Sequence, residues 1–175
     1  MKFHPTIYFN SVDNTSRFAL GTEGIKPLIV IGINPSTADD KVSDHTITKV
    51  KGFADGNGFD SFIMLNLYPQ RATDTNLLHA NINVEIHNQN LQIISSILQQ
   101  QINPTILASW SEKIVDRNYL KECLIAIFKI TKESNAKWIK LGDFTKSGHP
   151  RHPSRASYFL ALTSIEIESY IKKLN

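Results

Sequence analysis

Residues 27–33 spell PLIVIGI, a continuous apolar run rich in β-branched side chains. A run without polar alternation is typical of a strand that is buried on both faces of a parallel sheet. Three similar runs follow: SFIMLNL at 61–67, PTILASW at 104–110 and KWIKL at 137–141. A shorter strand is predicted at 17–20, just before the first run. The chain therefore offers four strands suited to the interior of one sheet.

Segments with the apolar spacing of amphipathic helices separate these runs. They lie at 45–57, 84–101 and 112–130, and a further one closes the chain at 164–174. Strands alternating with helices imply parallel strands joined by right-handed crossovers. We therefore predict one α/β domain over residues 1–175, with the sheet between helix layers.

The composition is that of an ordinary globular protein, with 41% hydrophobic and 20% charged residues. The lone cysteine, Cys123, excludes an internal disulfide and any Cys-rich zinc site. No leader-like apolar segment opens the chain, and no run approaches the ~20 apolar residues of a membrane span, so we expect a cytoplasmic protein without a membrane partner. The net charge of +3 permits contact with nucleic acid.

Polar segments follow each predicted strand at its carboxyl end. Asn34 follows the first strand, Arg71 the second, Trp110 the third and His152 the fourth. In open parallel sheets, ligands bind outside the carboxyl ends of the strands. We therefore expect these four segments to meet at one crevice.

The loop Gly32-Ile33-Asn34-Pro35-Ser36 is the first candidate for binding substrate. Gly32 allows close approach of a ligand, and Pro35 disfavours helical geometry at Asn34. Asn34 is then held at the strand end with a donor and an acceptor available, ahead of a helix N-terminus. The alternative is a plain turn with a local Asn hydrogen bond.

The second candidate is the loop that carries His149, Arg151, His152, Ser154 and Arg155. Its two prolines forbid a helix, so the two histidines do not form a helical metal site, and we expect no metal here. A rigidly held His152 is suited to stabilising negative charge that develops in a reaction. The arginines are candidates for phosphate contacts. The alternative is a solvated surface loop.

Acidic residues gather where the helix at 45–57 is expected to begin. Asp39, Asp40, Asp44 and His45 could hold a divalent metal, or the acids could complement the helix dipole. Of these, Asp44 is the better candidate for a role in the crevice.

Two further polar residues belong to the second strand and its loop. Asn66 lies in an apolar strand, where a buried amide must be hydrogen-bonded, either to a base edge or to a neighbouring loop. Arg71 is a candidate for binding phosphate or for pairing with Asp74.

Several of these motifs together resemble the bacterial domain-of-unknown-function 1643 family over nearly the whole chain. The matching segments are RFAL at 17–20, IGINPSTAD at 31–39, DHT at 44–46, NL at 66–67, RATD at 71–74, NQN at 88–90 and GHPRHP at 148–153. This resemblance implies no particular activity.

Shorter segments resemble the uracil-DNA glycosylase-like superfamily. Gly32-Ile33-Asn34-Pro35 is similar to a motif of the mismatch-specific thymine/uracil glycosylases, and His152-Pro153-Ser154 to a later motif of that superfamily. The resemblance implies a three-layer α/β/α sandwich around a mainly parallel four-stranded sheet. Ser36 departs from the motif, which has Gly or Tyr at this place.

The same resemblance implies a role for each matching residue. Asn34 would position the attacking water, His152 would stabilise the departing base, and Asn66 would read a flipped base. Arg155 and Ala156 stand where the superfamily inserts a wedge into the duplex, in place of Pro-Leu.

Three functions remain open from the sequence. The first is a metal-independent N-glycosylase without cofactor, a DNA-repair type of hydrolase that acts on DNA or a modified nucleoside. The second is a non-catalytic module that binds nucleic acid or a nucleotide on the same fold. The third is a metal-dependent phosphoesterase built on the acidic cluster.

Overall fold

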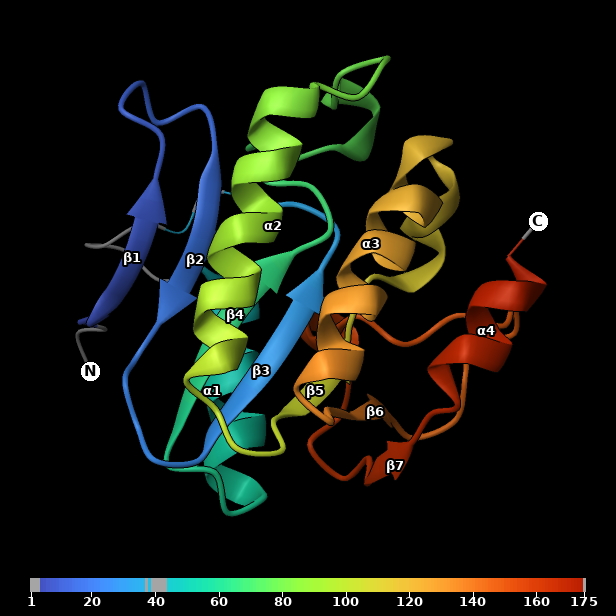
Figure 1. Cartoon of the computed structure of the whole chain (residues 1–175). Coiled ribbons are helices and arrows are strands. Elements are labelled where there is room, and N and C mark those ends of the chain that lie inside the picture. Colours follow the sequence, from blue (N-terminus) through green and yellow to red (C-terminus); the bar gives the residue numbers. More distant parts are fainter. Residues whose placement is uncertain (1–3, 37, 39–43, 175) are drawn as a thin grey trace.

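A computed structural model describes residues 4–36, 38 and 44–174 of the chain. Its centre is one seven-stranded sheet with the spatial order β1-β2-β4-β3-β5-β6-β7 (Figure 1). The strands are β1 (Ile7–Asn10), β2 (Arg17–Gly21), β3 (Pro27–Gly32), β4 (Ser61–Asn66), β5 (Thr105–Ala108), β6 (Lys137–Leu141) and β7 (Leu162–Ser164).

The four predicted strands are the parallel centre of this sheet. β3 pairs in parallel with β4 and with β5, and β5 pairs in parallel with β6. All six residues of β3 are buried, as its unbroken apolar sequence predicts. The α/β class is confirmed, but the expected number of four strands is wrong. β1, β2 and β7 extend the sheet as antiparallel strands at its two edges.

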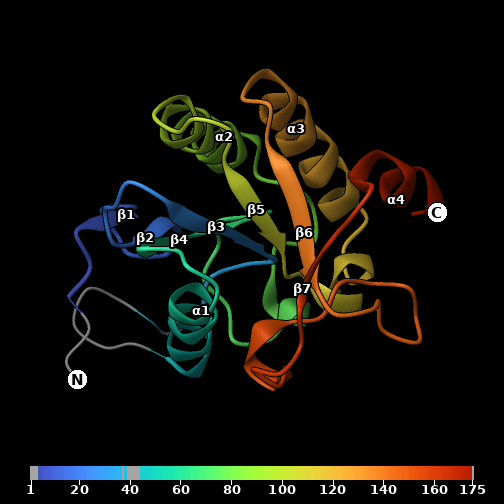
Figure 2. The ribbon, with the colours of Figure 1, turned by 90° about the horizontal axis from the view of Figure 1, so that it is seen from below.

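Helices cover both faces of the sheet. α1 (His45–Gly56) joins β3 to β4 on one face, while α2 (Val84–Gln99), α3 (Tyr119–Glu133) and α4 (Ile167–Lys173) cover the other (Figure 2). None of the helices in the described part of the chain is both long and apolar enough to cross a bilayer.

The core consists of two clusters, one on each side of the sheet. The larger cluster lies against α2 and α3 and includes Trp110 and Leu124, and the smaller one lies against α1 and includes Phe53 and Met64. Phe53 is 1% exposed, so its truncation to alanine would cost about 3–5 kcal/mol. This packing fixes α1, and with it the residues at its N-terminus.

The predicted helix at 112–130 is divided in the structure. Ser111–Val115 forms a short 3-10 helix, η2, and α3 begins only at Tyr119. Two further 3-10 turns are η1 (Thr75–Leu77) and η3 (Pro153–Arg155). All three follow carboxyl ends of strands, so they shape the edge of the sheet where a ligand is expected.

The strands that follow β3 in the sequence are added to the sheet on opposite sides of it. The chain passes through α1 to β4 on one side of β3 and later through α2 to β5 on the other side. Such a switch of direction leaves a crevice outside the carboxyl ends of the central strands. The topology therefore places the crevice next to Gly32 and Asn34.

Candidate functional site

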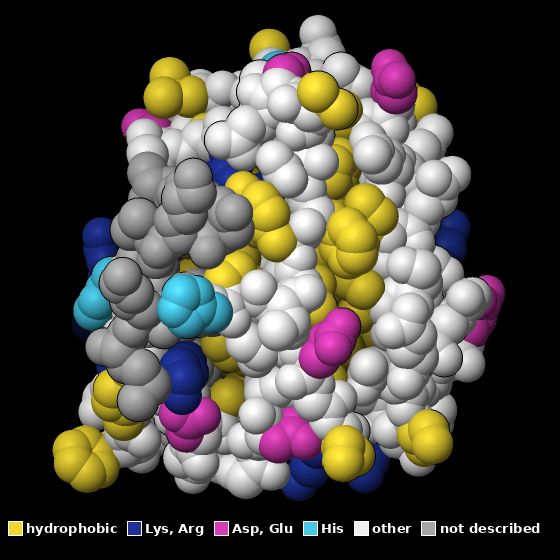
Figure 3. Space-filling model, turned by 90° about the vertical axis from the view of Figure 1, so that its left-hand side faces the viewer, with side chains coloured by type: hydrophobic (Ala, Val, Ile, Leu, Met, Phe, Trp, Pro, Cys, Tyr) yellow, Lys and Arg dark blue, Asp and Glu magenta, His cyan; other side chains and the backbone are white. Residues whose placement is uncertain are grey.

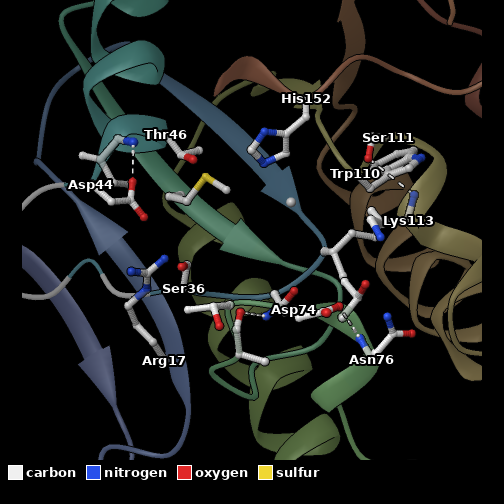
Figure 4. Close-up of a pocket in the computed structure, with 18 residues that line it drawn as sticks. Arg17, Ser36, Asp44, Thr46, Asp74, Asn76, Trp110, Ser111, Lys113 and His152 are labelled. Carbon is white, nitrogen blue, oxygen red and sulfur yellow. Dashed lines mark hydrogen bonds between the residues drawn. The ribbon is translucent and has the colours of Figure 1, made fainter. Parts of the chain in front are cut away.

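A pocket of about 470 Å³ lies at this crevice, within the size range of small-molecule sites. Both loops singled out from the sequence contribute to it, because Asn34 and His152 line it together. Figure 4 shows residues at the N-terminus of α1 on one flank and residues after β5 on the other. The principal lining residues are Arg17, Gly32, Ile33, Asn34, Ser36, Asp44, Thr46, Asp74, Asn76, Ser111, Lys113 and His152.

The side-chain amide of Asn34 is held by the loop that follows β4. Its Nδ2 donates to the carbonyl oxygens of Ala72 (2.7 Å), Pro35 (3.0 Å) and Gln70 (3.4 Å). The nitrogen thus serves the fold, and no described residue donates a hydrogen bond to Oδ1. Asn34 therefore offers the pocket an acceptor in a fixed position. The sequence left open a plain turn with a local hydrogen bond. Asn34 makes that local bond, to Pro35, and also binds the distant residues Gln70 and Ala72.

His152 presents a hydrogen-bond donor to the same pocket. Its Nδ1 accepts from the backbone N–H of Ser154 at 3.3 Å and lies 2.8 Å from Ser154 Oγ. Because a backbone N–H can only donate, Nδ1 carries no proton, and the neutral ring carries its proton on Nε2. Figure 4 shows the ring directed into the pocket. Burial lowers the pKa of His152, and the nearby Asp44 carboxylate acts in the opposite direction.

Asp44 brings a carboxylate to the pocket while capping α1. Its Oδ1 accepts from the backbone N–H of Ile47 at 2.9 Å, the usual geometry of an N-cap. Its second oxygen accepts no hydrogen bond from a described residue. Both interpretations of Asp44 are therefore compatible, since one oxygen caps the helix and the other is available in the pocket.

Gly32 lines the pocket, and Asn66 lies beneath it, on the neighbouring strand β4. Asn66 is fully buried and does not line the pocket, but it lies beside Gly32 in the parallel register. A Cβ at position 32 would lie 3.1 Å from Asn66 Oδ1 and 2.7 Å from Met64 Cε. No described residue hydrogen-bonds either polar atom of the Asn66 amide. A buried amide without partners is costly, so this one is a candidate for contact with a ligand.

Arg71 does not pair with Asp74, one of the two partners considered from the sequence. Its guanidinium donates to the carbonyl oxygens of Ser36 (2.9 Å) and Ala38 (3.0 Å) and to the Tyr8 hydroxyl (3.0 Å). Asp74 instead caps η1. Arg71 does not line the pocket; it holds the loop that contains Ser36 against β1.

The buried Pro35 does not line the pocket either. The helix predicted at 45–57 is found as α1, which begins at His45, and residues 37 and 39–43 before it lie outside the described residues.

His149 is turned away from His152 despite the short spacing. Its Nδ1 lies 2.9 Å from the Tyr170 hydroxyl, and this hydroxyl accepts a hydrogen bond from Trp110 Nε1 at 2.9 Å. Burial lowers the pKa of His149. His149 therefore lies against α4, outside the pocket, where it connects the second loop to this helix.

Arg151, Ser154 and Arg155 do not line this pocket but a second cavity of about 680 Å³. The two cavities have four lining residues in common: Thr73, Ser111, Lys113 and His152. His152 therefore stands at the boundary between them.

Several lining residues were missed by sequence reasoning. Ser111 has a positive φ of 55°, which costs a non-glycine residue about 1–3 kcal/mol and is typical of functional sites. Lys113, Asp74 and Asn76 follow on neighbouring loops, and the buried Arg17 enters from β2. The sequence feature that could have pointed to Ser111 and Lys113 is the end of the third strand at Trp110, which the sequence analysis did place at the crevice.

The acidic cluster remains a prediction. Asp39 and Asp40 lie outside the described residues. His45 Nε2 lies 2.9 Å from the carbonyl oxygen of Ser154, so this ring bridges α1 to the second loop. Among the residues that the structure describes, no three His, Cys, Asp or Glu side chains are placed to hold one metal ion.

On the face at the β1 edge, the described Lys and Arg residues do not gather into one basic patch. Figure 3 shows Lys and Arg scattered over it, with Asp and Glu among them. A nucleic acid bound by charge would need a denser basic patch. The described part of this face therefore gives no support to nucleic-acid binding by charge.

Comparison with known proteins gives a family without an assigned activity. A family model described as "Protein of unknown function (DUF1643)" matches residues 17–154. No curated protein and no solved structure matches the chain.

Proposed function

This chain belongs to the DUF1643 family, and we propose that it hydrolyses the N-glycosidic bond of a nucleotide or of an unstacked base in DNA. One observation carries the proposal: Asn34 and His152 line one pocket, and the partners of Asn34 Nδ2 and His152 Nδ1 leave Asn34 Oδ1 as an acceptor and His152 Nε2–H as a donor for a ligand. Such hydrolysis needs both groups, because a water must be oriented at the sugar while the base departs with negative charge.

His152 stabilises the departing base. When the C1′–N bond breaks, the electron pair stays on the base, and its negative charge spreads to a ring carbonyl oxygen. A neutral imidazole whose Nε2 carries the proton donates a hydrogen bond to that oxygen without becoming charged. One such preorganised donor contributes about 10²–10³-fold to the rate.

Asn34 and Asp44 act on the water. Asn34 Oδ1 accepts a hydrogen bond from a water whose oxygen attacks C1′, forming the new C1′–O bond. The free oxygen of Asp44 takes the proton that this water releases, and the base takes up a proton from solvent. The Asp44 charge also stabilises the positive charge that develops on the sugar after the C1′–N bond breaks and before the water attacks.

Asn66, which lies beneath Gly32, reads the base through the opening that this glycine leaves. Its unpaired amide offers one donor and one acceptor, which together match the edge of a pyrimidine or purine. Gly32 leaves the approach open, because any larger residue would place a Cβ against Asn66 Oδ1.

The second loop argues against insertion into a duplex. Of the two residues that the resemblance placed at the wedge, Ala156 is 6% exposed and packs into the α1-side core, and Arg155 is exposed but lines the second cavity. Filling a gap in the base stack requires a side chain that reaches out from the surface. The proposed substrate is therefore a base that is already unstacked.

The test is release of free base from a panel of nucleosides, nucleotides and single-stranded oligonucleotides that carry normal, deaminated or alkylated bases. We expect at least one substrate to be cleaved, with a rate about 10²–10³-fold lower in His152→Ala. His4→Ala, which removes an exposed histidine away from the pocket, is the matched control and should be unaffected. No release of base from any member of the panel would refute the proposal.

A nucleotide-binding module without turnover is the second candidate. The open pocket and the lack of a wedge favour it, because neither feature requires chemistry. Submicromolar binding of a panel member without product would select this function instead.

A further inference from the structure

The second cavity extends the candidate site beyond His152. Four lining residues, among them Ser111 and Lys113, belong to both cavities, so the 680 Å³ space begins where the first pocket ends. It continues towards η3 and is lined there by Arg151 and Arg155. A ligand in the first pocket therefore has one continuous route into the second.

Positive charge dominates the second cavity. Lys113, Arg151 and Arg155 line it, against one carboxylate, Glu112. Lys113 also pairs with Asp116 at 3.2 Å outside the cavity. The remaining polar lining is mostly hydroxyl groups, which donate hydrogen bonds to anions.

The two arginines have donors to spare. Arg151 Nε donates to the carbonyl oxygen of Asp143 at 3.1 Å, which fixes the side chain. Its two terminal nitrogens, and the whole Arg155 guanidinium, make no hydrogen bond or ion pair with any residue that the structure describes. Free, planar guanidinium groups bind phosphate oxygens in pairs, more specifically than a lysine does.

We propose that the second cavity binds the phosphate group of a nucleotide whose base occupies the first pocket. This inference rests on the proposed function and assigns the part of the site that holds the phosphate of its substrate. The phosphate belongs either to a mononucleotide or to a strand, and both present the same oxygens to Arg151 and Arg155.

The first test needs no knowledge of the base. Inorganic phosphate and pyrophosphate are titrated into the full chain, and arginine Nε–H signals are followed by NMR. We expect saturable shifts of the Arg151 and Arg155 signals, with pyrophosphate affinity about tenfold weaker in Arg155→Ala and only partly restored in Arg155→Lys, which keeps the charge but not the paired donors. The control is Lys129→Ala, which removes an exposed cation on α3 and should leave the affinity unchanged. Absence of binding, or equal affinity in the Arg151→Ala/Arg155→Ala double variant, would overturn the proposal.

The second test separates this inference from the proposed function. Deoxyuridine, its 5′-monophosphate and a single-stranded oligonucleotide containing one deoxyuridine are compared as competitors of pyrophosphate. Pyrophosphate binding that depends on the arginines, without cleavage of any substrate, retains the phosphate site and refutes only the glycosidase. Cleavage that is equally fast for nucleoside and nucleotide refutes the phosphate site alone. Competition that is stronger for the oligonucleotide assigns the phosphate to a strand, and equal competition assigns it to a mononucleotide.

Discussion

Replacing Asn34 with aspartate tests whether its amide nitrogen serves the fold and its oxygen the pocket. The change keeps the shape of the side chain but replaces Nδ2 with an oxygen. Nδ2 donates to Ala72 O at 2.7 Å and to Pro35 O at 3.0 Å, with a longer contact to Gln70 O at 3.4 Å. The introduced carboxylate would place negative charge against these carbonyl oxygens.

The two shorter hydrogen bonds set the size of the effect. Each contributes about 1 kcal/mol net, and the Ala72 carbonyl, left without a donor, costs about 1 kcal/mol more. The Pro35 carbonyl keeps the backbone N–H of Ala72 at 3.0 Å. We therefore expect Asn34→Asp to lower the free energy of unfolding by roughly 3 kcal/mol at pH 7. In a domain of this size that corresponds to a fall in Tm of roughly 6–12 °C.

The pH dependence gives this variant a signature of its own. The facing carbonyl oxygens raise the pKa of the introduced carboxyl in the folded state above its unfolded value. Near that pKa, the folded variant then binds more protons than the unfolded chain. The difference in the free energy of unfolding between Asn34→Asp and wild type therefore shrinks as the pH falls. The assay is thermal unfolding by circular dichroism at pH 7 and pH 4.5. A Tm within about 2 °C of wild type at pH 7 would refute the assignment of Nδ2 to these carbonyls. Asn118→Asp, at an exposed position before α3, is the matched control.

Three further predictions concern groups around the site. Burial lowers the folded-state pKa of His87, His149 and His152 below the ordinary value of 6.5, so the unfolded chain binds more protons. The free energy of unfolding should therefore fall as the pH drops from 7 to 5, less steeply in His152→Gln, and a urea midpoint that rises over this range would contradict it. Arg71→Ala removes charged hydrogen bonds to two loop carbonyls and should cost about 2–4 kcal/mol in chemical denaturation, whereas a loss below about 0.5 kcal/mol would show that they do not hold the loop. Burial raises the pKa of the Cys123 thiol to about 12, so a disulfide reagent at pH 8 should label the unfolded chain only, and rapid labelling of the folded protein would disprove that burial.

The central strands were predictable because strands buried on both faces have unbroken apolar sequences. PLIVIGI at 27–33 contains all of β3, which is buried throughout. The edge strands β1 and β7 are short and only partly buried, and such strands leave almost no periodic pattern. The break between η2 and α3 was missed because helical apolar spacing continues across it.

The site was predictable where the fold alone determines it. Asn34 and His152 follow two central strands at their carboxyl ends, and parallel topology brings such positions together. The orientation of His149 depends instead on Tyr170 in α4, a contact between remote segments. The left-handed Ser111 and the carbonyls bound by Arg71 likewise follow from tertiary packing, which sequence spacing does not encode.

A crystal structure of the chain soaked with free nucleobases tests the central claim most directly. The account predicts a base in the 470 Å³ pocket, with a ring carbonyl within hydrogen-bond distance of His152 Nε2 and an ordered water on Asn34 Oδ1. A base bound at another place, or a His152 ring that turns Nε2 away from the occupied pocket, would contradict it.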